Sequence, residues 1–134
     1  MDLSSLLTGR ELPDLVEIGA LQLERQTAAA FRQMQFAAAQ DGFDIQLVSA
    51  YRSFERQRLI WNNKALGLRP VLDSDGVPLD LTQMSEHAVV MAILRWSALP
   101  GASRHHWGTD LDVWDQAAVP ADYVLQLTPA EYAA

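Results

Sequence analysis

Residues 41–53 read DGFDIQLVSAYRS, and this stretch predicts a helix end, a strand and a helix start in succession. Asp41-Gly42 is a typical helix end, because glycine readily adopts the left-handed backbone found there. From Phe43 to Ser49 apolar and polar residues alternate, as they do in a strand with one buried face. Ser53 is a favourable N-cap for a following helix that Gly67 would close. The residues in between, Ala50-Tyr51-Arg52, therefore lie where the strand passes into the helix.

The segments on either side add helices early in the chain and strands late. Leu21 to Gln40 carries apolar residues at helical spacing, and Thr82 can cap a further helix that ends before Pro100-Gly101. Two further strands are expected at Thr109–Trp114 and Tyr123–Leu127. A long connection is expected at Leu68–Leu81. This order predicts an α+β fold, with a small, mostly antiparallel sheet packed by about three helices.

Composition limits the classes of protein to which the chain can belong. Its 134 residues suffice for one domain with one hydrophobic core. The formal net charge is −7 and the arginines are scattered, which argues against a nucleic-acid partner. No apolar run approaches the ~20 residues that a membrane span needs. Because cysteine is absent, any metal site must use His, Asp or Glu, and the compartment stays open.

A second stretch, SRHHWGTDLD at residues 103–112, places histidines beside carboxylates. His105 and Asp112 are too far apart for one helical turn, but Gly108 between them permits a bend that brings them together. Imidazole nitrogen and carboxylate oxygen are both ligands that suit zinc. Asp110 could orient one of these ligands without itself binding the metal. Two alternatives are a solvated turn with a histidine stacked on Trp107, and a catalytic triad of Ser103, His105 and Asp112. The triad lacks the usual strained turn around its serine.

Arg52 is the candidate charged group at the strand-to-helix junction. A guanidinium in this place can grip a carboxylate or stabilise a developing oxyanion. Gln57 follows about one helical turn later. The alternative for a lone arginine is a surface salt bridge, which contributes little to stability.

The two stretches together resemble a known family. Ser103-x-His105-x-x-Gly108-x-x-x-Asp112 resembles the zinc motif of peptidase family M15, the D-alanyl-D-alanine carboxypeptidases and dipeptidases. A chance match at four such positions is expected in roughly one chain in a thousand. Ser49-Ala50-Tyr51-Arg52-Ser53, followed by Gln57, resembles the upstream substrate motif of the same family.

The resemblance implies a fold like that of Hedgehog domains and D-Ala-D-Ala peptidases, and a role for each matching residue. His105 and Asp112 would bind Zn²⁺, with Asp110 behind them. Arg52 would be catalytic, and the residues that contact a peptidoglycan-derived peptide ending in D-Ala would be Tyr51, Gln57 and Ser103. The implied reaction is zinc-dependent hydrolysis of the D-Ala-D-Ala bond in peptidoglycan stem peptides or their precursors. A non-catalytic domain that binds zinc or cell-wall peptide is the alternative, since Hedgehog-type domains resemble these peptidases in that way. The substrate implies the periplasm or cell envelope, and a cytoplasmic location stays possible.

The family pattern also includes a later Glu-x-x-His motif that this sequence lacks, since no histidine follows His106. That motif supplies a third ligand and the general base, and His87 and His106 are poor substitutes for the ligand. Thr128-Pro129-Ala130-Glu131 reads as a capping box that starts a helix near the end of the chain. We therefore expect residues 1–134 to form a single, C-terminally incomplete peptidase domain that binds zinc weakly by itself. The oligomeric state is left open.

Overall fold

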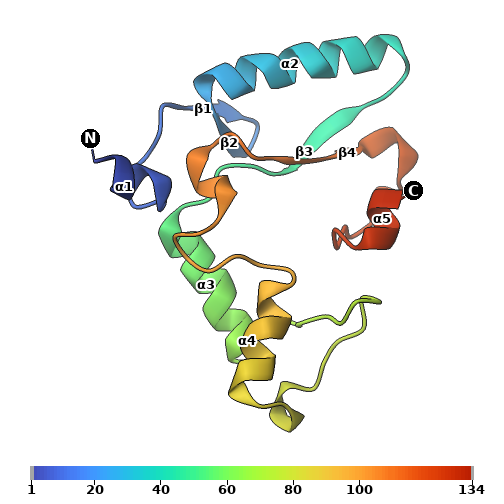
Figure 1. Ribbon diagram of the computed structural model, residues 1–134. Helices are drawn as coiled ribbons and strands as arrows, with labels where there is room; N and C mark the ends of the chain where they lie inside the picture. The colour runs from blue at the N-terminus through green and yellow to red at the C-terminus, as the bar shows by residue number, and fades with distance from the viewer. Residues whose placement is uncertain (1, 134) are drawn as a thin grey trace.

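The computed structural model describes residues 2–133 and shows a mixed helix and strand architecture (Figure 1). The helices are α1 (Leu3–Leu7), α2 (Arg25–Gln40), α3 (Phe54–Ala65), α4 (Glu86–Leu94) and α5 (Pro129–Ala133). The strands are β1 (Leu15–Ile18), β2 (Leu21–Glu24), β3 (Ile45–Ser49) and β4 (Asp112–Asp115). Three 3-10 turns lie at Leu81–Gln83, Arg104–Trp107 (η2) and Gln116–Ala118. The α+β class is confirmed. No helix in the described part of the chain is long and apolar enough to cross a membrane.

The strands form two small antiparallel sheets instead of one. β1 pairs with β2 as a hairpin, and β3 pairs with β4, which comes more than 60 residues later. Helix α2 runs along these strands (Figure 1), and the core between them contains Leu23, Ala28, Phe31 and Ala50. The β3–β4 ladder has an irregularity between Leu47 and Ser49, just before the strand passes into α3. The core therefore fixes the end of β3, three residues before Arg52.

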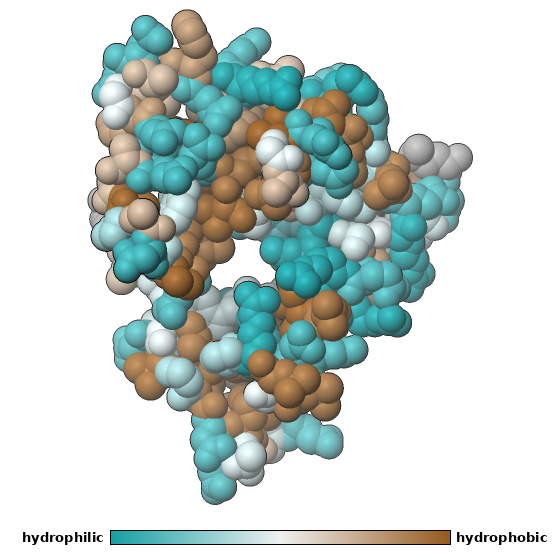
Figure 2. Space-filling model, turned by 180° about the vertical axis from the view of Figure 1, so that it is seen from behind, coloured by the Kyte–Doolittle hydropathy of each residue, from teal (hydrophilic) through white to brown (hydrophobic). Residues whose placement is uncertain are grey.

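Helices α3 and α4 pack together on the other side of the molecule (Figure 1), with Ile60 and Ile93 buried in this part of the fold. The Ser53 side chain caps α3 by accepting a hydrogen bond from the Arg56 N–H at 3.1 Å, as the sequence predicts. A hollow separates this helical pair from the sheets. Figure 2 shows it from behind, with hydrophobic side chains along one wall and hydrophilic ones along the other.

Four predicted elements differ from the structure. The strand expected at Thr109–Trp114 is β4, which begins only at Asp112. Residues 21–24 form strand β2, because the Glu24 carboxylate accepts the N–H groups of Gln26 and Thr27 and starts α2 only at Arg25. The helix expected to start at Thr82 starts after Ser85, which caps α4. Residues 123–127 form no strand, because the Glu131 carboxylate accepts the Gln126 N–H. The predicted capping box is present, since Thr128 N–H donates to Glu131 at 2.9 Å and Glu131 N–H donates to Thr128 at 3.4 Å.

The N-terminal helix, which the sequence did not predict, packs against η2. The Trp107 indole donates to the Leu7 carbonyl at 3.1 Å, and the Phe54 N–H donates to the Gly9 carbonyl at 2.9 Å. Gly9 has φ +76°, and a Cβ there would lie 2.5 Å from Nδ1 of His106 and 2.9 Å from the Phe54 nitrogen. Only glycine therefore allows this close approach.

Gly9 and Gly19 form a matched pair for a stability test. Both have positive φ, but a Cβ at Gly19 would meet no atom within 4 Å. We expect Gly19→Ala to cost about 1 kcal/mol, the penalty for a left-handed alanine. Gly9→Ala should cost about 3 kcal/mol or more, since overpacking adds to that penalty. Urea denaturation followed by circular dichroism measures both, and equal losses would contradict the close contact at His106.

Candidate active site

The turn η2 brings the two predicted zinc ligands together. Ser103 caps the turn by accepting the His105 N–H at 3.3 Å, and Gly108 ends it with a left-handed φ of 75°. The chain then reverses into β4, where Asp112 pairs with Ser49 of β3. Nε2 of His105 lies 3.4 Å from Oδ2 of Asp112. Gly108 thus makes the bend that the spacing of the motif requires.

The donor set and its geometry fit a zinc ion. Nδ1 of His105 bonds to the Asp110 main-chain carbonyl at 3.0 Å, which assigns the proton to Nδ1 and leaves Nε2 free for a metal. Two ligands at ~2.1 Å from a tetrahedral zinc are about 3.4 Å apart, the separation of Nε2 and Oδ2. The carboxylate of Asp110 lies 3.9 Å from Nε2, so Asp110 supports His105 mainly through its carbonyl.

Asp112 is held in its charged form. Its Oδ2 accepts a hydrogen bond from the Ser49 hydroxyl and its Oδ1 accepts one from the Tyr132 hydroxyl at 3.2 Å. Contact with His105, followed by the Ser49 bond, lowers the pKa of Asp112 to about 2. The same contact raises the pKa of His105. A carboxylate ionised at neutral pH is the form that a cation requires.

Within residues 2–133, no group of three or more His, Asp or Glu side chains could hold a metal ion. His87 is exposed on α4, whereas His106 is buried and already bonded at both ring nitrogens. The described part of the chain therefore brings together only the two predicted ligands, His105 and Asp112, and no third candidate.

The alternatives weighed for these residues do not match the structure. Ser103 is 4% exposed and serves as a cap, while both nitrogens of His105 face Asp110 and Asp112, so no triad forms. Trp107 is 42% exposed and bonds to Leu7, so the segment is no simple solvated turn.

Arg52 lines the same cleft as His105 and Asp112, and its guanidinium is held by Gln57. Its Nη1 donates to Oε1 of Gln57 at 2.9 Å, and Nε2 of Gln57 donates to the Ala98 carbonyl at 2.7 Å. Gln57 is completely buried, so both of its polar atoms are already used. Burial lowers the pKa of Arg52, while the charge of Asp112 opposes that shift. No carboxylate in the described residues forms an ion pair with Arg52, so the surface salt bridge is not formed.

The main chain of Arg52 is fixed by hydrogen bonds to two residues of η2. Arg52 N–H donates to the His105 carbonyl at 3.0 Å, and the Arg52 carbonyl accepts from Nδ1 of His106 at 2.6 Å. Nε2 of His106 in turn accepts the Gly101 N–H at 3.0 Å. Because Nε2 accepts an N–H and Nδ1 faces a carbonyl, the ring is neutral with its proton on Nδ1. His106 is fully buried, and this burial lowers its pKa. The spacing of the motif suggests His106 only as a poor metal ligand and does not reveal this structural role.

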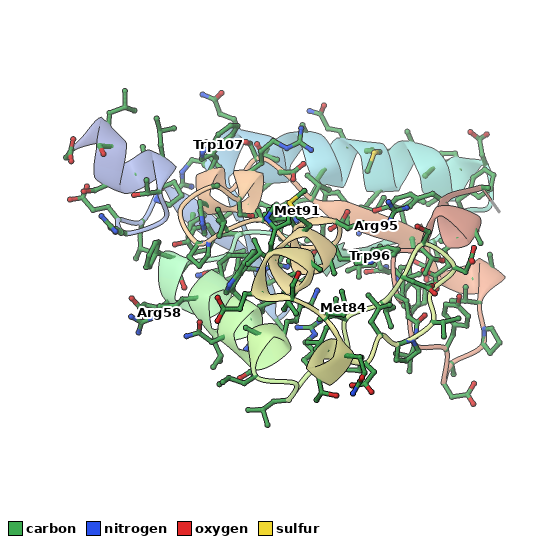
Figure 3. All side chains as sticks on the ribbon, turned by 60° about the horizontal axis from the view of Figure 1, so that its bottom comes forward. Arg58, Met84, Met91, Arg95, Trp96 and Trp107 are labelled. Atoms are coloured by element: carbon green, nitrogen blue, oxygen red, sulfur yellow. The ribbon has the colours of Figure 1, made fainter. Side chains whose placement is uncertain are left out.

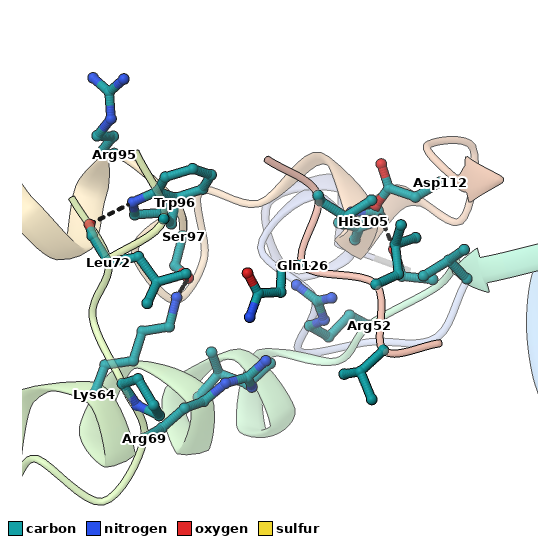
Figure 4. A pocket seen from close by; sticks show the side chains of 18 of the residues that line it. Arg52, Lys64, Arg69, Leu72, Arg95, Trp96, Ser97, His105, Asp112 and Gln126 are labelled. Atoms are coloured by element: carbon teal, nitrogen blue, oxygen red, sulfur yellow. Dashed lines mark hydrogen bonds and ion pairs between the residues drawn. The ribbon is translucent and has the colours of Figure 1, made fainter. Parts of the chain in front are cut away.

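A cleft of about 1040 Å³ separates the β3–β4 sheet from α3 and α4. Figure 4 shows Arg52, His105 and Asp112 at one end of it and Lys64, Arg69 and Trp96 towards the other. Tyr51, Gln57 and Ser103, which the sequence predicted as substrate contacts, do not line the cleft. Substrate contact by these three residues stays a prediction.

Solved peptidase structures share this fold. The zinc complex of the vancomycin-resistance D,D-pentapeptidase VanY from a VanB-type cassette matches with a TM-score of 0.59 and 23% identity, over 78% of this chain and 53% of that one. VanYB in complex with D-alanine-D-alanine matches with a TM-score of 0.61 and 20% identity, over 81% and 54%. The LdcB LD-carboxypeptidase gives a TM-score of 0.52 and 24% identity, over 81% and 44%. This chain therefore shares the fold of these structures and spans about half of their length.

The family follows from the sequence match. The family model described as VanY, D-alanyl-D-alanine carboxypeptidase, matches residues 20–132. An uncharacterized protein of Haemophilus influenzae is 43% identical over 99 residues, which cover 70% of this chain and 68% of that protein. The chain belongs to the VanY family of D-alanyl-D-alanine carboxypeptidases, within peptidase family M15, as the two motifs predicted.

His106 can be tested as a structural residue against a matched histidine. His106→Leu would leave the Arg52 carbonyl and the Gly101 N–H without a partner, so we expect a loss of about 2–4 kcal/mol in the free energy of unfolding. His87→Leu, on the exposed face of α4, should change stability by less than about 0.5 kcal/mol. Urea denaturation measures both, and a small effect at His106 would refute its role.

Lys64 provides a pH-dependent test. It is 8% exposed and donates to the Ser97 hydroxyl at 2.6 Å. Burial, followed by the charges of Arg69 and Arg52, lowers the pKa of Lys64 to about 8. Above this pH the unfolded chain binds more protons than the folded one, so stability should rise between pH 8 and about 10. The expected slope is up to about 1 kcal/mol per pH unit at pH 7.5–9.5, and Lys64→Met should remove it. A flat wild-type profile in that range would contradict the burial of a charged Lys64.

Proposed function

We propose that this chain carries the substrate-binding part and two metal ligands of a zinc-dependent peptidase that hydrolyses the D-Ala-D-Ala bond of peptidoglycan stem peptides or their precursors. The observation that carries the proposal is the placement of Nε2 of His105 and Oδ2 of Asp112, 3.4 Å apart, in the same cleft as Arg52. The membership of the VanY family and the zinc and D-alanine-D-alanine complexes of its structural neighbours support it.

Each residue would have a defined task in this reaction. A zinc ion, when bound, would polarise the scissile carbonyl and lower the pKa of a water molecule. Arg52 would meet the negative charge that develops on the carbonyl oxygen, and its bond to Gln57 limits the positions that its guanidinium can take. The Asp110 carbonyl holds the proton of His105 on Nδ1 and so keeps Nε2 directed at the metal.

A catalytic zinc site ordinarily has three protein ligands. We propose that residues 1–134 form the N-terminal part of one peptidase domain, and that the third ligand and the general base lie in the remainder. The coverage of about half of the VanY structures supports this division. The substrate class makes the periplasm or cell envelope the expected location.

The second candidate is a domain of the same fold that binds zinc or cell-wall peptide without hydrolysis. It is favoured by one observation, that the described residues bring together two metal ligands and no third.

Three substitutions in the full-length gene product separate these functions. Arg52→Lys keeps the charge but loses the guanidinium fork, so D-Ala release from a D-Ala-D-Ala peptide should fall about 100-fold or more, with zinc binding unchanged. His105→Ala should lower both zinc affinity and D-Ala release. Arg58→Lys is the control, because Arg58 points outward from α3 (Figure 3) and pairs only with Glu55.

Zinc content by mass spectrometry and release of D-Ala by chromatography are the measurements. Zinc and peptide binding without D-Ala release in the wild type would favour the non-catalytic domain. Unchanged release in Arg52→Lys would refute the role of Arg52.

A further inference from the structure

Ser49 opens the stretch Ser49-Ala50-Tyr51-Arg52-Ser53 and is the last residue of β3. Its hydroxyl donates to Oδ2 of Asp112 on the neighbouring strand. Oδ2 is also the oxygen that lies 3.4 Å from Nε2 of His105, and Figure 4 shows His105 and Asp112 next to each other. Ser49 therefore holds the oxygen of Asp112 that faces the other predicted ligand.

The irregularity in the β3–β4 ladder puts Ser49 opposite Asp112. From Ile45 to Leu47 the strands pair in a constant register, in which the residue opposite Asp112 would be Val48. The register shifts after Leu47, and Ser49 takes this place instead. A bulge redirects a side chain, and opposite residues of an antiparallel pair share one face of the sheet. The irregularity thus gives the carboxylate a hydroxyl donor as its cross-strand neighbour, where a regular ladder would give it a valine.

The covalent geometry of an aspartate does not fix the orientation of its carboxylate. Rotation about the Cβ–Cγ bond is broad and twofold, so either oxygen can turn towards a neighbour. Both oxygens of Asp112 are held here, Oδ2 by Ser49 and Oδ1 by the Tyr132 hydroxyl at 3.2 Å. Ser49 and Asp112 are half-buried, whereas Tyr132 is 68% exposed. Because a hydrogen bond is stronger where water is excluded, Ser49 is the main constraint on the carboxylate.

The bond from Ser49 leaves Oδ2 able to bind a cation. A carboxylate oxygen has two lone pairs, and one hydroxyl proton occupies only one of them. The other is free for a metal ion shared with Nε2 of His105, since the separation of 3.4 Å suits two ligands of one zinc ion.

We propose that Ser49 is a positioning residue of the metal site, which fixes the carboxylate of Asp112 so that Oδ2 faces Nε2 of His105. This inference rests on the proposed function and adds to it a residue that acts through a ligand. Partners that orient metal ligands typically contribute about 10- to 100-fold to metal affinity. Without the hydroxyl the carboxylate would be free to rotate, and the affinity for zinc would fall.

The test measures zinc affinity of the full-length gene product by competition with a chelator of known affinity. Ser49→Ala should bind zinc about 10- to 100-fold more weakly than the wild type. Ser49→Thr keeps the hydroxyl, and a β-branched residue suits a strand, so its affinity should stay within about threefold of the wild type. Urea denaturation of each metal-free variant checks that the compared proteins are folded.

Two further variants are matched controls. Tyr132→Phe removes the other hydroxyl from the same carboxylate and should lower zinc affinity by less than about threefold, because Tyr132 is exposed. Ser97→Ala removes a hydroxyl that lines the same cleft but bonds to Lys64, and it should leave zinc affinity unchanged.

Wild-type zinc affinity in Ser49→Ala would overturn the inference and leave the proposed function intact. A Ser49→Thr variant that binds zinc as weakly as Ser49→Ala would also overturn it, since the hydroxyl would then not be the cause. So would an equally large loss in Tyr132→Phe, which would assign the constraint to Oδ1. Absence of zinc binding by the wild type would count against the proposed function itself, and the inference would fall with it.

Discussion

The main chain of Arg52 is hydrogen-bonded to the turn η2 through both its N–H and its carbonyl, and the arrangement of the site depends on this link. Its N–H reaches the His105 carbonyl and its carbonyl reaches the His106 ring. Each bond spans more than 50 residues of sequence, so together they join the end of β3 to the turn η2. The guanidinium that would act on the substrate and the imidazole that would bind the metal are therefore positioned by the same contact.

This link is buried, and its donors and acceptors are matched. His106 is neutral and uses both ring nitrogens, and Gly9 allows the N-terminal segment to close over the ring. Gln57 uses both ends of its amide in the same way, between Arg52 and the Ala98 carbonyl. Among the described residues, no buried side-chain nitrogen or oxygen lacks a partner. A fully satisfied polar network in a low-dielectric interior favours one geometry over others, which is what a precise active site needs.

Local sequence patterns predicted those parts of the fold that local interactions determine. Strand β3, the Ser53 cap of α3, the Gly108 bend and the capping box at Thr128 all follow from residues within a few positions of each other. The predicted elements that differ from the structure depend on less common or more distant contacts. Glu24 is a less common helix cap than Ser or Asp, and the carboxylate of Glu131 takes a backbone donor that a strand would need. The roles of His106 and Lys64 depend on partners 30 or more residues away, which spacing along the chain does not reveal.

Helix α3 sets the relation between the two ends of the cleft. Arg52 precedes its first turn and Lys64 lies in its last turn, so a rigid element fixes how far apart these cations are. The chain is acidic overall, whereas Arg52, Lys64 and Arg69 line this cleft and form no ion pair with a carboxylate of residues 2–133, so they locally offset the acidic charge of the chain.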